Sequence, residues 1–162
     1  MSFFYYPSCK KTYRLVIKSA VSGKKVKLEL SNEHAKNDVE IGSVTVAKCD
    51  ENGNFTSEFK TISVNSQKSF TIAKGDVVKT DEVELNIEAG EYFCVSAYVT
   101  KGALRSGNLI DDAYLITTKG NVTTESKVEN QPRIRDSVRK FASTALRMYF
   151  HKPIPLFQAV QV

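Results

Sequence analysis

Serine-dependent hydrolysis is the first chemistry to test, because the chain contains many serines and two histidines, His34 and His151. A serine nucleophile needs a histidine base within hydrogen-bond reach and a third group that orients the histidine. The pair Asp136-Ser137 lies within a helical sequence pattern, which lacks the strained, exposed turn of a nucleophile elbow. We therefore predict that Ser137 is an ordinary surface residue and that this chain has no catalytic residue.

Carboxylates give no strong sign of a glycosidase or metal site. Glu82 and Glu84 alternate along one side of a strand pattern, which separates them by about 7 Å. That spacing falls within the range of glycosidase carboxylates, but a solvated strand face accounts for it better. The pair Asp111-Asp112 and the turn 50–52 could offer oxygen ligands to calcium, yet neither has EF-hand spacing and turns are commonly rich in Asp and Asn. No phosphate-binding loop motif is present, so no metal and no cofactor are predicted.

The three cysteines, Cys9, Cys49 and Cys94, lie far apart and form no C-x-x-C motif. A zinc site or a dithiol redox motif is therefore not predicted. The odd number and the wide spacing favour reduced thiols, with one disulfide and a spare thiol as the alternative. The aromatic opening, residues 1–7, lacks the basic and long apolar regions of a signal peptide. These features predict a cytoplasmic protein.

Aromatic rings that stack on sugars are a further candidate chemistry. Tyr92, Tyr98 and Tyr114 are the candidate carbohydrate-binding residues, because many β-sandwiches hold sugars on aromatic platforms. The chain has no tryptophan, and each tyrosine could equally belong to the core. Two exposed, coplanar rings on one face would favour sugar binding.

The net charge of +5 has two main sources, residues 10–14 and residues 133–147. Lysine and arginine elsewhere are mixed with aspartate and glutamate, and no basic stripe with interleaved aromatic residues is present, so nucleic-acid binding is not predicted. No apolar run approaches the roughly 18 to 20 residues that cross a bilayer, so no membrane insertion is predicted.

The elements that would position these residues are strands. From Tyr13 to about Thr118, apolar residues recur with a period of two and turn signals interrupt them about every 8 to 12 residues. Gly42 stands where the alternation slips, which indicates a bulge or a bend. Residues 92–100 are apolar or aromatic on both parities, which indicates a central strand covered on both sides. We predict an all-β fold, a jelly-roll-like β-sandwich over residues 1–120.

The period changes after residue 120. A polar loop is predicted over 121–132, and an amphipathic helix over 133–150 whose apolar residues recur every three or four positions. The helix is expected to pack on the sandwich, with docking on another protein as the alternative. Pro153 and Pro155 would end it and leave an extended tail over 151–162.

Several segments together point to a family. Residues 26–32 read V-K-L-E-L-S-N, residues 41–47 read I-G-S-V-T-V-A, and further matches follow at Phe70-Thr71-Ile72, Gly75, Thr80-Asp81, Val83, Leu85, Gly90 and Val95-Ser96. In order and spacing this series resembles the N-terminal domain of bacterial two-domain SGNH/GDSL-type hydrolases, over about residues 12–118. The loop after Asn32 departs from that family, because it reads E-H-A-K-N without the usual glycine.

The resemblance implies a β-sandwich domain that precedes the hydrolase domain. The family takes its nucleophile from a Gly-Asp-Ser block and its base from an Asp-x-x-His block, and this chain contains neither. The tail segment P-I-P-L-F resembles the linker to the catalytic domain, so Ile154, Leu156 and Phe157 are the predicted docking residues, in cis or in trans. The apolar tail and N-terminus would also suit a homodimer. The predicted function is a non-catalytic accessory module, with a free-standing carbohydrate-binding module as the alternative.

Overall fold

The computed structural model describes residues 10–33, 37–102, 113–128, 133–134 and 145–151. Every regular element in these ranges is a strand, and all strand pairs are antiparallel. The strands are β1 (Lys11–Lys18), β2 (Gly23–Ser31), β3 (Val39–Cys49), β4 (Lys60–Ile62), β5 (Phe70–Ile72), β6 (Val77–Lys79), β7 (Val83–Ile87), β8 (Tyr92–Lys101), β9 (Ala113–Lys119), β10 (Arg133–Ile134) and β11 (Ala145–His151). The described part of the chain contains no helix long and apolar enough to cross a membrane.

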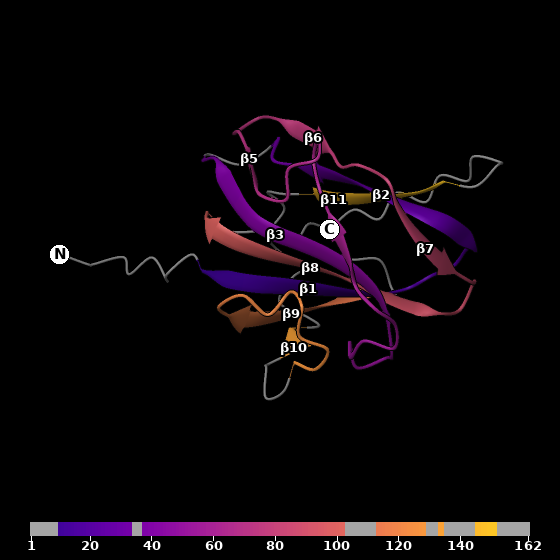
Figure 1. Ribbon diagram of the computed structural model, residues 1–162. Coiled ribbons are helices and arrows are strands. Elements are labelled where there is room, and N and C mark those ends of the chain that lie inside the picture. The colour runs from indigo at the N-terminus through magenta and orange to yellow at the C-terminus, as the bar shows by residue number, and fades with distance from the viewer. Residues whose placement is uncertain (1–9, 34–36, 103–112, 129–132, 135–144, 152–162) are drawn as a thin grey trace.

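Two sheets face each other (Figure 1). The large sheet runs in the order β10-β9-β1-β8-β3-β4, with β5 also paired to β3. The small sheet runs β11-β2-β6, with β7 also paired to β2. Among the strands up to β8, the chain crosses between the sheets from β1 to β2, from β2 to β3, from β5 to β6 and from β7 to β8, which is compatible with a jelly-roll-like sandwich. The predicted all-β sandwich is therefore confirmed.

The main core lies between the sheets and follows from the period of two. Alternate residues of each strand point inward, because successive side chains of a strand face opposite sides. Those on the large sheet come mostly from β1, β3 and β8, and those on the small sheet from β2 and β7. The fully buried members include Val26, Leu28, Val44, Val46, Ile62, Ile72, Phe93 and Val99.

Gly42 marks the predicted irregularity in β3. The register of β3 against β8 shifts between Ile41 and Ser43. A Cβ at position 42 would lie 2.8 Å from Cδ1 of Tyr98, closer than side-chain carbons approach. The glycine therefore allows both the bulge and the tyrosine ring beside it.

The outer face of the large sheet is also covered. β8 lies between β1 and β3 and buries Phe93 and Val95 on one side and Cys94 and Ser96 on the other. Two segments cover the outer face: the β3–β4 loop, and residues 120–128. We call residues 120–128 the strap. A second apolar cluster lies beneath these two segments and consists of Val16, Cys49, Cys94 and Ile116, with Phe55 and Val128 packed against it. The prediction of a central strand covered on both sides is confirmed.

The predicted helix over 133–150 is wrong at both ends. Arg133–Ile134 pair with β9, and Ala145–His151 pair with β2 as a seven-residue strand; residues 135–144 lie outside the described residues. The sequence of β11 fits both periods, since Leu146, Met148 and Phe150 also alternate. In the observed register these three residues stand opposite the core residues Leu30, Leu28 and Val26 of β2. An available sheet edge thus outweighed the local helical pattern.

Candidate functional site

The tyrosines proposed for sugar binding do not form one platform. Tyr92 and Tyr98 lie on the outer face of β8, six residues apart, which corresponds to about 20 Å along the strand. Both are half-buried: Tyr92 packs against the second cluster with the Lys18 ammonium 5.9 Å from its ring centre, and Tyr98 lies against Gly42. Tyr114 pairs with Val16 in β9, and its side chain lies outside the described residues.

The most elaborate polar site in the described structure is built around Arg14. This side chain on the outer face of β1 is only 1% exposed. Its Nε donates to the Ser96 hydroxyl at 2.8 Å, and its two terminal nitrogens donate to four backbone carbonyls. The carbonyls belong to Gly53 at 3.0 Å, Val122 at 3.1 Å, Glu125 at 2.6 Å and Ser126 at 3.3 Å. All five guanidinium hydrogens thereby have partners.

Arg14 is held by neutral groups and by an aromatic ring. Its Cζ lies 4.3 Å from the ring centre of Phe55, a cation–π contact in a desolvated place. Neither of the two ion pairs found among the described residues includes it. Burial lowers the pKa of Arg14, but an arginine side chain stays charged in proteins. The arrangement joins the strap and the β3–β4 loop to the large sheet, which is a positioning role.

Hydroxyl groups fasten the strap further along the same face. The Thr45 hydroxyl donates to the Thr123 carbonyl at 2.6 Å, and Ser43 and Thr123 share a hydroxyl contact at 3.0 Å. The Thr12 hydroxyl donates to the Gly120 carbonyl at 2.7 Å and accepts from the Val122 amide at 3.0 Å. The hydroxyls of Thr12 and Thr45 therefore satisfy backbone groups of the strap rather than forming an open site.

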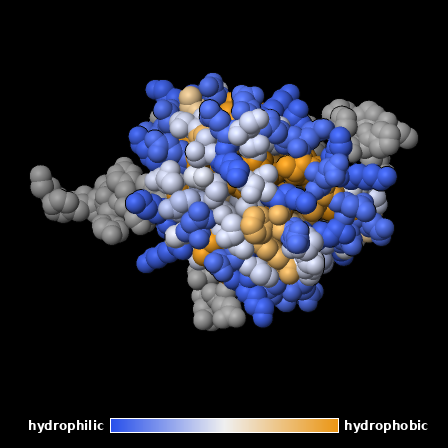
Figure 2. Space-filling view, viewed as in Figure 1, coloured by the Kyte–Doolittle hydropathy of each residue, from blue (hydrophilic) through white to orange (hydrophobic). Residues whose placement is uncertain are grey.

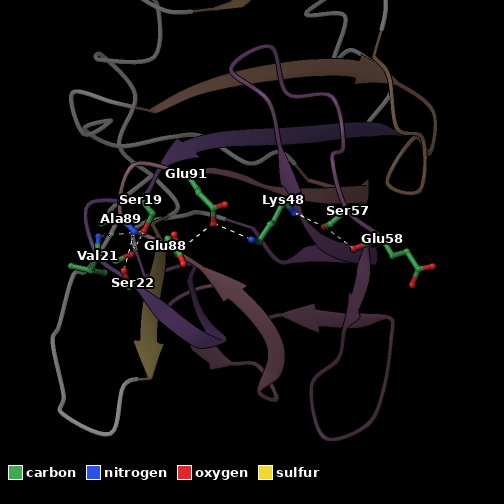
Figure 3. Close-up of polar contacts among 9 residues, drawn as sticks. All are labelled: Ser19, Val21, Ser22, Lys48, Ser57, Glu58, Glu88, Ala89 and Glu91. Carbon is green, nitrogen blue, oxygen red and sulfur yellow. Dashed lines mark hydrogen bonds and ion pairs between the residues drawn. The ribbon is translucent and has the colours of Figure 1, made fainter.

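A second polar cluster closes one end of the sandwich, where the β1–β2 turn, β3 and the β7–β8 turn meet (Figure 3). The Glu91 carboxylate accepts from the Lys48 ammonium at 3.0 Å and from the Glu88 amide at 2.8 Å. The Ala89 amide donates to the Ser22 hydroxyl at 3.0 Å. The backbone hydrogen bond to Glu88 and the lysine together hold the pKa of Glu91 below its ordinary value.

This lowered pKa predicts an acid-sensitive contact. A carboxyl group with a depressed folded-state pKa stabilises the fold above its unfolded-state pKa, near 4.5, and loses that contribution as the pH falls through the folded-state value. We expect the thermal midpoint of the wild-type chain to fall more steeply between about pH 5 and pH 3 than that of Glu91→Gln. Parallel pH profiles of the two proteins would contradict this role, and Glu84→Gln on the exposed face of β7 is the control.

The carboxylates considered for catalysis or calcium have structural roles or are solvated. Glu82 and Glu84 are exposed, and Glu82 pairs with Lys25 at 3.5 Å. Burial opposes ionisation of Asp50, but hydrogen bonds from Asn54, Asn52 and Gly53 outweigh it and lower the pKa. Among the described residues, no group of three or more histidines, cysteines, aspartates or glutamates could hold a metal ion. Asp111-Asp112 lie outside the described residues.

Some of the residues singled out in the sequence lie outside the described residues. These are His34, Ser137 and the predicted docking residues Ile154, Leu156 and Phe157. His151 ends β11 opposite Lys25.

Figure 2 shows apolar atoms on one face as small patches among hydrophilic ones. The large apolar side chains that are exposed in the described part are Phe59 and Val77, and single residues of this kind are ordinary on protein surfaces.

The segments that carry the family resemblance form a connected framework around the end of β2. Asn32 is fully buried, and its side-chain amide donates to the carbonyls of Asn37 at 2.9 Å and Ile72 at 3.1 Å. Its backbone carbonyl accepts from the Gly75 amide at 2.9 Å. The Thr80 hydroxyl accepts from the Leu28 amide at 2.9 Å. Gly75 has a φ of 81°, which is costly for residues other than glycine.

No protein-family model matches this chain, and no curated protein matches it either. Sequence reasoning missed Arg14 as the centre of the large sheet's outer face. The available signal was an arginine between Thr12 and Val16 on one parity of β1, within a segment whose other residues, Tyr13 and Leu15–Ile17, are apolar.

Proposed function

We propose that this chain is the non-catalytic accessory module of an SGNH/GDSL-type hydrolase, which covers or orients the catalytic domain in cis or in trans. The observation that supports this proposal is that residues from the segments resembling the family are joined by hydrogen bonds in the fold. Asn32, Gly75 and Thr80 connect the end of β2 to the loops after β5 and β6. This shared role supports reading the series as a fold signature rather than as a chance run of alternating strands.

The chemistry of the described polar residues agrees with an accessory role. Arg14 and the hydroxyls of Thr12 and Thr45 are engaged with backbone groups of the strap, and Glu91 is engaged with Lys48. A catalytic nucleophile or base instead needs a partner arrangement aimed at substrate. The module would act by presenting a rigid surface, since both faces of its large sheet are packed.

The test is ester hydrolysis by the chain of 162 residues and by the complete product of its gene. We expect p-nitrophenyl acetate to hydrolyse at the uncatalysed rate in the presence of the chain alone, and faster in the presence of the complete product. Turnover by the chain alone that is lost in His34→Ala or His151→Ala would overturn the proposal. Inactivity of the complete product towards a panel of short-chain esters would exclude the arrangement in cis.

A free-standing carbohydrate-binding module is the alternative. The separation of Tyr92 and Tyr98 by about 20 Å and their half-buried rings favour the accessory module over it. Binding to a glycan array that is lost in Tyr92→Ala or Tyr98→Ala would reverse that preference.

A further inference from the structure

The two described cysteines lie next to each other beneath the strap. Cys49 ends β3 and Cys94 lies in β8, and both point to the outer face of the large sheet. Cys49 stands opposite Tyr92 and Cys94 opposite Ala47, so the two cysteines are diagonal neighbours. Both are free thiols, 6% and 0% exposed respectively, and share one apolar cluster with Val16.

A buried guanidinium lies close to this thiol pair. Contact with the Cys94 thiol and burial raise the pKa of Cys49, while the positive charge of Arg14 acts in the opposite direction. With the strap in place, the Cys49 thiol is therefore held in the unreactive protonated form. Water that entered beneath the strap would weaken the burial effect on Cys49 and leave the Arg14 cation near its sulfur atom, which favours the thiolate.

Access to the pair depends on the strap and on the β3–β4 loop. These two segments are joined by the hydrogen bond from the Phe55 amide to the Ser126 carbonyl, at 3.0 Å. Phe55 and Val128 pack directly on the cluster that contains the thiols. Arg14, Thr45 and Thr12 fasten the cover to the sheet. Opening of the strap is the local event that would expose the thiols without unfolding the sandwich.

We propose that Cys49 and Cys94 are a strap-gated redox pair that forms a reversible intramolecular disulfide with peroxide as the two-electron oxidant. The Cys49 or Cys94 thiolate attacks one peroxide oxygen and the O–O bond breaks, so that the sulfur becomes a sulfenic acid and hydroxide leaves. The hydroxide takes up the proton that the thiol released when it ionised, which gives the first water. The second thiol then attacks the sulfenic sulfur, the S–O bond breaks, and its proton leaves with the hydroxyl group as a second water. Both sulfur atoms are oxidised and both peroxide oxygens are reduced.

The diagonal placement predicts a labile bond. Diagonal neighbours of an antiparallel pair have Cα atoms about 7 to 8 Å apart, whereas disulfides usually need less than about 7 Å. Closure therefore requires a small shift of β3 against β8. A disulfide formed under such constraint is easily reduced again, which suits a switch rather than a structural cross-link.

The experiment uses the full chain with Cys9→Ser, so that Cys49 and Cys94 are its remaining cysteines. Hydrogen peroxide is added to the native protein, and intact mass is followed after denaturing alkylation. We expect a product about 2 Da lighter that cannot be alkylated and that dithiothreitol restores. Thr45→Val removes a buried fastening of the strap, and we expect it to accelerate product formation roughly tenfold.

Matched variants separate the gate from the chemistry. Thr71→Val, on the exposed side of β5, should leave the rate unchanged, and Cys94→Ser should abolish the lighter product. If Thr45→Val does not fold, Ser43→Ala loosens the same strap residue, Thr123. Oxidation of the cysteines to separate sulfinic acids, or equal rates with intact and loosened strap, would overturn the proposal.

Discussion

Replacing Arg14 by methionine is expected to lower the free energy of unfolding by about 3 to 5 kcal/mol, a large part of the total stability of a single domain. Methionine preserves most of the side-chain length but removes every donor. Four backbone carbonyls and the Ser96 hydroxyl then lose their partner around a side-chain position that is almost fully buried. Buried polar groups left without partners account for the size of the effect.

Urea unfolding followed by circular dichroism measures this change, and hydrogen exchange locates it. We expect Arg14→Met to raise exchange at the strap amides more than at the amides of β2 and β7. Lys24→Met removes an exposed cation and should change stability by less than about 0.5 kcal/mol. A loss of stability in Arg14→Met no larger than in Lys24→Met would show that Arg14 does not hold the strap.

Asn32→Ala is expected to destabilise the fold by about 2 to 4 kcal/mol. The fully buried Asn32 amide joins the carbonyl of Asn37, in the β2–β3 loop, to that of Ile72, at the end of β5. Alanine leaves both carbonyls without this donor and leaves a small cavity. The amides of Gly75 and Asn32, which bond within the same loop cluster, should exchange with solvent faster than those of the core strands.

Asn86→Ala is the matched control, because Asn86 is exposed on β7. Chemical denaturation gives the free energy of unfolding of both variants. Asn32→Asp is a further variant, because it replaces the amide donor by an acceptor that faces two carbonyls. We expect Asn32→Asp to be at least as destabilising as Asn32→Ala at neutral pH. Stability of Asn32→Asp close to wild type would mean that the two hydrogen bonds do not hold the loops.

The local sequence pattern predicted the secondary structure correctly where a single type of element satisfied both the intrinsic propensity and the burial of the side chains. The alternation in Tyr13–Ile17, the glycine at position 42 and the double-sided apolar run of 92–100 each correspond to an observed feature of the large sheet. In a half-buried or fully buried strand, the polarity of each side chain matches the burial of the face on which it lies. The same logic failed for 145–150, because that segment satisfies helical and strand periods together and the edge of β2 decided between them.

The local alternation of apolar residues was enough to predict an all-β sandwich with a central strand apolar on both sides. The burial of Arg14 among carbonyls of two distant loops, and the contact between Cys49 and Cys94, became visible in the folded chain alone. Alternation is a local property, whereas the contacts of Arg14 join residues 39 to 112 positions apart. Register between strands, which no single segment specifies, sets which side chains meet.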